Sequence, residues 1–364
     1  MVIPMASDYG LDLPKDTQLQ YLAEGGANVV YRITPPPSEV PPSEIEYYGD
    51  NTPPPAEIED SFQFQQRFCG NLLRLRKDVQ FGLPYRDTAN NFDTRIRHLF
   101  RPEDLVDQIL VRIPPAVIQR CNEQLRLSEK KGKRPLARHG VYLATNEPFG
   151  MLITDMTNFA DPTATVAELK PKWLVPSPSA PVGAKRCRTC ALRDMKNADS
   201  GKTPAPSALL EPRVAFCPLD LISDKIEDVQ RATRIFKGRS DQIRIAKALY
   251  HHPTLKKLVS LQHSHNDVGL HGPPAHSRDM SLGMTLRDCT VFVKIPSNYS
   301  PSTKLHPNPI ELRIGDLDLK TAAGGKAAYW RTLETRLIQE GWYMGENPGQ
   351  LQMNSECALS RSRR

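Results

Sequence analysis

Apolar residues in the first part of the chain come in short runs bounded by turn-forming residues, and this pattern predicts β-strands. Between Gln18 and Ile33, an apolar pair is followed by Glu-Gly-Gly-Ala-Asn at residues 24–28 and then by Val-Val-Tyr-Arg-Ile. Valine, tyrosine and isoleucine favour strands and paired glycines permit a tight turn, so this segment is predicted to be a β-hairpin. Further short strands are predicted at residues 71–77, 141–143 and 151–154.

Two apolar stripes with helical spacing lie between these strands, and they predict two helices. Residues three or four positions apart share one face of a helix. The first stripe consists of Leu105, Val106, Ile109 and Leu110, and the second consists of Val117, Cys121 and Leu125. Pro114 and Pro115 separate the two, because proline interrupts a helix.

The second half of the chain alternates between both patterns. Strands are predicted at residues 288–295 and 311–315, and a last helix at residues 328–339. Two more helical stripes precede them. Their members are Ile226, Val229, Thr233 and Phe236, then Ile243, Ala246 and Leu249. The mixture indicates an α+β protein.

The length of the chain points to two lobes. Single hydrophobic cores tend to stop growing at about 250–300 residues, and this chain has 364. We place the boundary after the predicted strand at residues 151–154, which gives an N-lobe of residues 1–157 and a C-lobe of residues 158–364. The N-lobe is expected to be rich in strands and the C-lobe to be larger and mixed.

A proline-rich segment interrupts the N-lobe at about residues 34–57. The chain contains 33 prolines, and this segment is crowded with Pro, Ser and Glu. Such a composition buries too little apolar surface to fold, so we interpret the segment as an exposed insertion. A polyproline helix that binds a partner is the alternative.

The formal net charge of +7 favours polyanionic partners. Nucleic acid, acidic lipid and phosphorylated metabolites all fit it. Seven cysteines, an odd number in a long chain, indicate reduced thiols, as in the cytosol or nucleus. We expect a soluble protein, since no signal peptide and no run of about 20 apolar residues is present.

Asp316 and Asp318 are the first candidate site residues, because they directly follow an apolar strand. In extended chain two residues two positions apart face the same side. Carboxylates in that position suit Mg²⁺, which uses few protein ligands beside substrate phosphates. Taken alone, the pair is better explained by a capped turn with a surface salt bridge.

The order of other residues along the chain supports phosphoryl transfer. That reaction requires a turn over the phosphates, a nearby cation, a carboxylate that orients the acceptor hydroxyl, and carboxylates for the metal ion. Gly25-Gly26, Arg74, Asp288 and Asp316 follow one another in this order. No Walker motif, His-Arg-Asp or Asp-Phe-Gly is present, so an ordinary protein kinase is not expected.

Lys170 and Lys172 form a second constellation, in Glu-Leu-Lys-Pro-Lys-Trp at residues 168–173. In an extended stretch their side chains project the same way, which suits a cluster of phosphates. Lysines that protect the edge of a sheet are the alternative explanation.

Five motifs in order along the chain resemble the inositol-pentakisphosphate 2-kinase family. They are Glu-Gly-Gly-Ala-Asn-Val-Val at 24–30, Glu-Leu-Lys-Pro-Lys at 168–172, Cys-Pro-Leu-Asp-Leu at 217–221, Arg-Asp-Cys-Thr at 287–290 and Asp-Leu-Asp-Leu-Lys at 316–320. The resemblance implies a two-lobed protein-kinase-like fold, the inositol phosphate kinase fold, with a cleft between the lobes. It also implies transfer of phosphate from ATP, with Mg²⁺, to the 2-hydroxyl of inositol 1,3,4,5,6-pentakisphosphate, which gives inositol hexakisphosphate (phytate).

The resemblance also implies roles for individual residues. Asp288 is the expected catalytic residue, which accepts or orients the hydroxyl proton, and Asp316 with Asp318 is the expected Mg²⁺ site. The expected ATP-binding residues are Gly25, Gly26, Ala27, Asn28, Arg74, Asp155 and Thr157. The expected inositide-binding residues are Arg138, Lys170, Lys172, Lys196, Arg244, Lys320, Lys326 and Tyr329.

Two alternatives to this function stay open at the level of sequence. One is a protein that binds inositol phosphate or RNA on a kinase-like fold without catalysis, and the other is a kinase of a different inositol phosphate. The presence of all the expected carboxylates argues against the first. We expect a monomer that binds no membrane, in the nucleus or cytoplasm.

Cys187 and Cys190 raise the question of a structural zinc site. A single Cys-x-x-Cys supplies half of the four ligands that such a site needs. His263, His265, His271 and His276 in a loop further along the chain could supply the other half. The sequence alone does not favour zinc.

Overall fold

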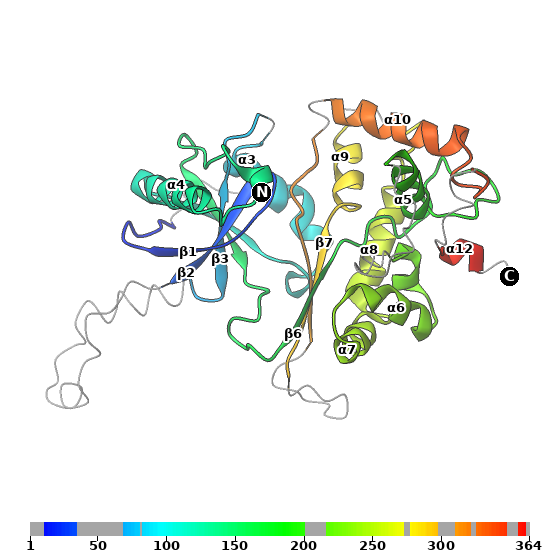
Figure 1. Ribbon diagram of the computed structural model, residues 1–364, viewed down its shortest axis with the longest axis horizontal. Coiled ribbons are helices and arrows are strands. Elements are labelled where there is room, and N and C mark those ends of the chain that lie inside the picture. Colours follow the sequence, from blue (N-terminus) through cyan, green and yellow to red (C-terminus); the bar gives the residue numbers. More distant parts are fainter. Residues whose placement is uncertain are drawn as a thin grey trace, which may run out of the picture. The chain divides into compact units, whose positions relative to one another are not determined.

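The computed structural model describes residues 11–34, 68–80, 82–200, 216–272, 277–297, 310–321, 325–347 and 356–361. They group into two compact units (Figure 1). Unit 1 takes its described residues from Met1–Asn91 and Val106–Asp155, and unit 2 from Phe92–Leu105 and Met156–Arg364. The predicted proline-rich insertion lies outside the described residues, apart from Thr34 at the end of a strand.

Unit 1 is built on a five-stranded antiparallel sheet with the order β1-β2-β3-β5-β4. The predicted hairpin is confirmed as β1 and β2, and two other predicted strands are confirmed as β3 and β5. The strands are β1 Gln18–Glu24, β2 Asn28–Thr34, β3 Asn71–Arg76, β4 Gln108–Arg112 and β5 Phe149–Thr154.

Helices cover both faces of this sheet. The predicted helix that carries Val117, Cys121 and Leu125 is confirmed as α4, Pro115–Lys130 (Figure 1). These side chains pack with Val29 and Leu73 of the sheet. The helix α3, Tyr85–Asn91, packs against Leu110 and Met151 on the other face. Side chains alternate across a strand, so the apolar residues of each strand feed two separate cores.

Two predictions for unit 1 were wrong. The stripe at residues 105–110 is not helical, since Gln108–Arg112 is the edge strand β4 and pairs with β5. Residues 141–143 do not form a strand and make only one isolated bridge, between Leu143 and Lys77.

Unit 2 contains a three-stranded antiparallel sheet with the order β6-β7-β8. Its strands are β6 Thr165–Leu169, β7 Thr290–Ile295 and β8 Glu311–Gly315, which confirms both strands predicted in this half. Four helices form one core with this sheet. They are α6 Ile226–Ala232, α7 Arg239–Leu249, α8 Pro253–Ser264 and α9 Arg278–Thr285, of which α6 and α7 were predicted.

A second, smaller core of unit 2 joins α5, Arg188–Asp199, to α10, Lys326–Gln339. The last helix, α12, is Ala358–Arg361. Short helical turns complete the described chain: η1 Phe92–Ile96, η2 Arg97–Leu99, η3 Pro102–Asp104, η4 Leu136–Arg138, η5 Pro218–Ile222 and η6 Thr233–Ile235. The predicted α+β class is confirmed. No helix of the described residues is long and apolar enough to cross a membrane.

Candidate functional site

The sheet of unit 2 brings three of the sequence motifs to one edge. Thr290 at the start of β7 pairs with Gly315 at the end of β8, so Asp288 and Asp316 lie at the same edge. Leu169 at the end of β6 pairs with Val291, which brings Lys170 to this edge as well. Antiparallel pairing thereby collects residues that are more than a hundred positions apart in sequence.

Three lysines contact the two carboxylates at this edge. The Nζ atom of Lys170 lies 2.6 Å from Oδ2 of Asp316 and 3.9 Å from Oδ1 of Asp288. Lys172 lies 2.6 Å from Oδ1 of Asp288, and Lys320 lies 3.1 Å from its Oδ2. We call these five residues the lysine–aspartate cluster. Their side chains are 25–40% exposed, so solutes can reach the cluster.

Two members of the cluster have an unusual backbone. Lys172 and Asp316 both have φ of 55°, in the left-handed region that residues with a Cβ rarely adopt. The chain is therefore not extended at either residue, which corrects the assumption that Asp316 and Asp318 face one side as in a strand. The tips of Lys170 and Lys172 both lie near Asp288. Strained backbone of this kind concentrates at functional sites.

Helix α9 holds the segment that carries Lys320. Thr285 is fully buried, and its hydroxyl accepts a hydrogen bond from the Lys320 backbone N–H at 2.9 Å. The hydroxyl of Ser281 donates to the carbonyl oxygen of Lys320. The position of Lys320 is thus set by its backbone, while its ammonium group reaches Asp288.

Arg287 and Gln262 support the cluster from inside unit 2, and sequence reasoning assigned a role to neither. The buried Arg287 guanidinium lies 4.5 Å from the Trp173 ring centre and donates to the carbonyls of Gln262, His265 and Gly283. The side-chain amide of Gln262 donates to the carbonyls of Lys172 and Leu286, both at 2.8 Å. Arg287 belongs to the Arg-Asp-Cys-Thr motif at 287–290. Gln262 belongs to no motif, because the residues that it binds are distant in sequence.

The lysines set the charge state of Asp288. Burial works to raise its pKa, but the hydrogen bond from Lys172 and the charges of Lys320 and Lys172 outweigh it and lower the pKa to about 2. Burial likewise works to lower the pKa of Lys170, and the hydrogen bond and charge of Asp316 raise it instead. At neutral pH Asp288 is therefore ionised and Lys170 is protonated.

A second charged network supports the glycine turn of unit 1. Lys77, which follows β3, contacts Glu24 and donates to the Gly25 carbonyl at 2.8 Å. Arg134 binds the same Glu24 carboxylate through two nitrogens, at 2.9 and 3.0 Å. We call Glu24, Lys77 and Arg134 the buried triad, because their side chains are at most 1% exposed.

Residues 25–28, which are candidate ATP-binding residues of unit 1, adjoin this triad. The backbone N–H of Lys77 donates to the Ala27 carbonyl, and Asn28 accepts from the Tyr85 hydroxyl at 2.9 Å. A guanidinium nitrogen of Arg138 would lie 4.0 Å from a Cβ placed on Gly26. Arg74 is buried on β3, with its guanidinium 5.4 Å from the Tyr85 ring centre. Sequence reasoning selected Arg74 on this strand and overlooked Lys77, three residues further along.

Other candidate residues lie outside these two groups. Asp155 directly follows β5, and its backbone N–H donates to the Gly70 carbonyl. The Thr157 hydroxyl accepts a hydrogen bond from the Phe159 backbone N–H at 3.3 Å. Asp318 is half-buried. Its predicted role as a second metal ligand stays a prediction.

Four candidate inositide ligands are spread over unit 2. Lys196 is exposed on α5, and Lys326 and Tyr329 are exposed in the first turn of α10. Arg244 on α7 donates to the Thr165 hydroxyl at 2.8 Å and to the Pro296 carbonyl at 2.7 Å. Thr165 begins β6 and Lys170 follows its end, so at about 3.4 Å per residue Arg244 lies well away from the cluster.

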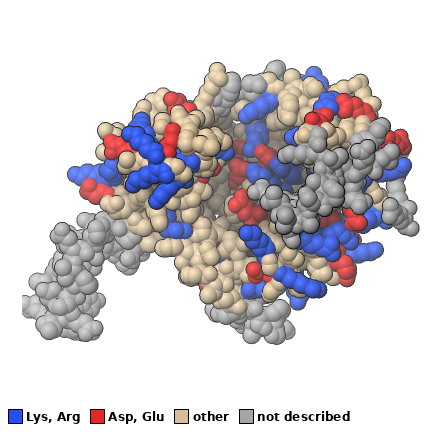
Figure 2. All heavy atoms as spheres, in the orientation of Figure 1, with Lys and Arg blue, Asp and Glu red and all other residues tan. Residues whose placement is uncertain are grey.

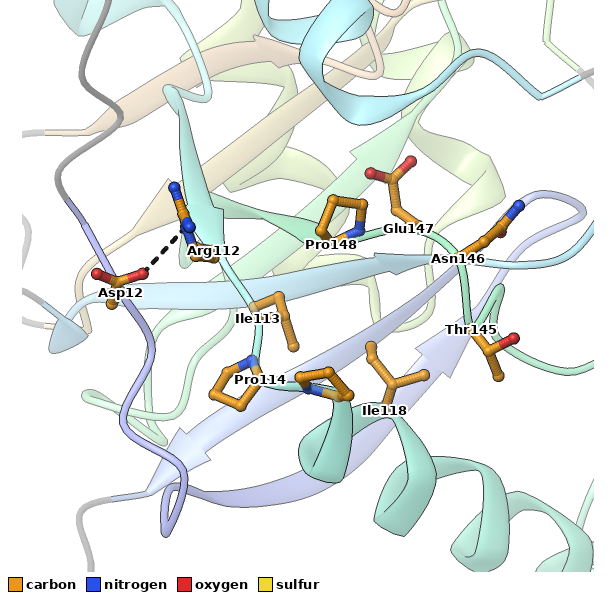
Figure 3. A pocket seen from close by; sticks show the side chains of 10 residues that line it. Asp12, Arg112, Ile113, Pro114, Ile118, Thr145, Asn146, Glu147 and Pro148 are labelled. Atoms are coloured by element: carbon orange, nitrogen blue, oxygen red, sulfur yellow. Dashed lines mark ion pairs between the residues drawn. The ribbon is translucent and has the colours of Figure 1, made fainter.

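The distribution of charge on the surface does not by itself mark the site. Basic and acidic side chains are interspersed on the face shown in Figure 2. A cavity of about 300 Å³ in unit 1 is lined by Asp12, Arg112, Ile118 and Glu147 among others (Figure 3). It contains none of the predicted site residues, so it is not the candidate site.

Cys187 and Cys190 lie beside two other cysteines and not beside histidines. Their partners are Cys217 and Cys357, and all four side chains are buried. No grouping with His263, His265 or His271 is found among the described residues, and His276 lies outside them. The described histidines of that loop therefore do not share a group of possible metal ligands with Cys187 and Cys190.

A two-unit α+β chain with lysines gathered on carboxylates at a sheet edge fits the class of proteins that handle phosphorylated ligands. Comparison with known families specifies the class. The family model described as inositol-pentakisphosphate 2-kinase matches residues 21–241 and 237–336. This chain therefore belongs to the inositol-pentakisphosphate 2-kinase family.

A curated relative matches as well. It is an inositol-pentakisphosphate 2-kinase from Yarrowia lipolytica, 32% identical over 191 residues, which are 50% of this chain and 54% of the relative. The match thus spans about half the length of that relative.

Proposed function

We propose that this protein is an ATP-dependent inositol-pentakisphosphate 2-kinase. It transfers the γ-phosphoryl group of ATP to the 2-hydroxyl of inositol 1,3,4,5,6-pentakisphosphate and forms inositol hexakisphosphate. Membership of the family supports the reaction. The single observation that carries the assignment to this chain's own residues is the convergence of Lys170, Lys172 and Lys320 on Asp288 and Asp316.

The lysines serve two purposes in this proposal. In the structure they neutralise the two aspartates, and their partial exposure leaves them accessible to an incoming polyanion. A substrate with five phosphates offers these ammonium groups stronger acceptors than one carboxylate does. The lysines can therefore exchange partners when the inositide binds. Arg138, Lys196, Arg244, Lys326 and Tyr329 are proposed as further inositide ligands from the family resemblance.

Asp288 is proposed as the catalytic residue. Its low pKa keeps it ionised at neutral pH, so one oxygen can accept a hydrogen bond from the acceptor hydroxyl and orient it. A carboxylate with such a low pKa is a weak base. Orientation of the hydroxyl is therefore the larger part of its role, and the proton passes to it late in the transfer.

Asp316 is proposed as the main Mg²⁺ ligand. Among the contacts of the described residues its Oδ2 is bound to Lys170 and Oδ1 has no partner, and the side chain is 40% exposed. An accessible carboxylate oxygen beside a phosphate site fits Mg²⁺, which retains several waters. Bound Mg²⁺ neutralises charge that develops on the transferred group. Asp318 is proposed as a second ligand of lower importance.

Unit 1 is proposed to bind the phosphates of ATP at residues 25–28. Backbone N–H groups at a glycine turn approach phosphates closely because no Cβ intervenes. The buried triad fixes this turn, since Lys77 binds both Glu24 before it and the carbonyl of Gly25 within it. Arg74, Asp155 and Thr157 are proposed as further ATP contacts.

The direct test is incubation of the purified chain with Mg-ATP and inositol 1,3,4,5,6-pentakisphosphate, with product separation by anion-exchange chromatography. We expect inositol hexakisphosphate, with the new phosphate at position 2 by NMR. An intact, folded chain that forms no hexakisphosphate overturns the proposal. Product from other inositol phosphates at equal rates would instead place the chain among kinases of broader specificity.

A further inference from the structure

The side-chain amide of Gln262 joins the two segments that carry Lys172 and Asp288. Gln262 is fully buried near the end of α8. Its Nε2 atom donates to the carbonyls of Lys172 and Leu286, both at 2.8 Å, and its Oε1 atom accepts from the Leu174 backbone N–H at 2.8 Å. One side chain therefore contacts both the loop that follows β6 and the turn that precedes β7.

This amide connects the two segments where the sheet no longer pairs them. The backbone pairing between β6 and β7 runs from Thr165 and Ile295 to Leu169 and Val291. Beyond it, buried backbone groups still require hydrogen-bond partners. A primary amide supplies two N–H donors and one carbonyl acceptor, which match the two carbonyls and the N–H that Gln262 binds. Gln262 thus extends the connection between the segments towards the lysine–aspartate cluster.

The hydrogen bonds of Gln262 also lie on either side of an unfavourable backbone conformation. Lys172 has φ of 55°, which a residue with a Cβ rarely adopts. Gln262 binds the Lys172 carbonyl and the Leu174 N–H, which flank Trp173. Trp173 is itself held, since two buried guanidinium groups each lie 4.5 Å from its ring centre. Contacts inside unit 2 therefore determine the direction in which the Lys172 side chain leaves the backbone.

Arg287 fixes the position of Gln262 in turn. Its buried guanidinium donates to the backbone carbonyls of Gln262 at 2.9 Å and His265 at 3.0 Å, at the C-terminal end of α8. Basic side chains bind the last carbonyls of a helix favourably. The turn that carries Asp288 is therefore bound to α8 by two links, one from the Gln262 side chain to Leu286 and one from the Arg287 side chain to Gln262.

We propose that Gln262 is a positioning residue, which holds the Lys172 side chain against the Asp288 carboxylate in the orientation that phosphoryl transfer requires. This role rests on the kinase function proposed above. The 2.6 Å contact between Nζ of Lys172 and Oδ1 of Asp288 joins the same two segments, so a shift of one segment against the other alters it directly. Gln262 is fully buried and therefore acts through these two residues and not on a substrate.

The variants Gln262→Met and Gln262→Glu test this role in the full chain. Methionine preserves the approximate shape and removes all three hydrogen bonds, whereas glutamate keeps the acceptor and loses at least one of the two donors. A displacement of about 1 Å at a reacting group can lower the rate about 10²-fold, so we expect kcat to fall about 10- to 100-fold in both variants. The KM for ATP should not change, because the glycine turn proposed to bind its phosphates belongs to unit 1.

The acid limb of the pH profile of kcat/KM separates positioning from stability. Burial works to raise the pKa of Asp288 and the lysines lower it to about 2, so loss of the Lys172 contact should move the limb to higher pH in both Gln262 variants. The matched control is Thr254→Val, which removes the 2.6 Å hydrogen bond from another fully buried side chain of α8 to Asp104. It should lower the thermal midpoint and leave kcat and the acid limb unchanged.

Two results would overturn the role of Gln262 while the natural chain still forms hexakisphosphate. The first is an unchanged kcat, or a fall in kcat with an unmoved acid limb, because Lys172 would then still lie against Asp288. The second is failure of both Gln262 variants to fold beside a folded Thr254→Val, which would make Gln262 a residue of the core alone. A natural chain without activity is a different result, since it overturns the proposed kinase function and, with it, any role in that reaction.

Discussion

The lysine–aspartate cluster of unit 2 and the buried triad of unit 1 use the same chemistry in opposite environments. Both bind carboxylates with cations at hydrogen-bond distance. The triad is at most 1% exposed, whereas the side chains of the cluster are 25–40% exposed. Buried ion pairs cannot exchange partners without leaving a charge in an apolar environment, but exposed ones can. We therefore expect the triad to keep its ion pairs and the lysines of the cluster to exchange partners when a ligand binds.

Backbone conformation sharpens this difference. Two residues of the cluster have left-handed backbone, and no residue of the triad does. The residues of the cluster lie beside the ends of three strands, β6, β7 and β8, whereas the triad surrounds a single turn. Changes in the cluster should therefore alter activity more than stability, and changes in the triad should do the reverse.

The largest expected effect is the loss of kinase activity in the Asp288→Asn variant. Loss of the carboxylate removes orientation of the acceptor hydroxyl and its proton acceptor, so we expect kcat to fall about 10³- to 10⁴-fold. ATP affinity, measured by fluorescence or calorimetry, should change little. Asp93→Asn, which alters an exposed aspartate paired with Arg97, is the matched control and should keep full activity. Loss of ATP binding in Asp288→Asn would mean that Asp288 is structural.

The next largest expected effect is a loss of stability in the Glu24→Gln variant. This change leaves the buried ammonium of Lys77 and guanidinium of Arg134 without a carboxylate, which costs about 3–5 kcal/mol of unfolding free energy. Urea denaturation followed by circular dichroism measures it.

The control for Glu24→Gln is Asp12→Asn, which breaks an exposed ion pair with Arg112 in the same unit. That pair should contribute no more than about 1 kcal/mol. Equal losses in the two variants would contradict the distinction between buried and exposed pairs.

A smaller effect on activity is expected in Lys172→Met. Removing one partly exposed cation should lower kcat/KM for the inositide about 10-fold, since partly solvated contacts contribute less than buried ones. The pKa of Asp288 should also rise towards its ordinary value, so the acid limb of the pH profile of kcat/KM moves to higher pH. Lys185→Met, at an exposed lysine near Glu346, should change neither. If the acid limb does not move, Lys172 does not lower the pKa of Asp288.

The smallest effect is the contribution of Asp288 to stability at low pH. The folded-state pKa of about 2 lies below the ordinary value of 3.8, so the stabilisation is complete above pH 3.8 and is lost as the pH falls through 2. Partial exposure limits it to at most about 1 kcal/mol. Unfolding free energies of the natural chain and Asp288→Asn should therefore converge between pH 4 and pH 2. A constant difference over this range would show that the lysines do not lower the pKa.

Sequence reasoning selected the members of the cluster one by one, because they belong to local motifs at strand ends. Lys170, Asp288 and Asp316 each follow or precede a recognisable apolar strand, and antiparallel pairing explains why they meet. The exact geometry was not predictable, since the left-handed backbone of Lys172 and Asp316 depends on packing from Gln262 and α9. Those partners are distant in sequence and leave no periodic signal.

The errors in the fold have a similar cause. Strand β4 was taken for part of a helix because Gln108 occupies a buried position and interrupts the expected alternation. Its side chain accepts a hydrogen bond from Arg74 at 3.4 Å, a tertiary contact that permits burial of a polar group. Cys357 was not connected to Cys187 because 170 positions separate them. Spacing rules for metal ligands detect only neighbours in the chain.

The left-handed backbone of Lys172 and Asp316 bears on protein design. Glycine adopts this conformation freely, while a residue with a Cβ incurs about 1–2 kcal/mol. A procedure that optimised this chain for stability alone would therefore favour glycine at both positions. It would delete one ammonium group and one carboxylate from the proposed site. A redesign of this fold must hold these two residues fixed and seek its added stability elsewhere.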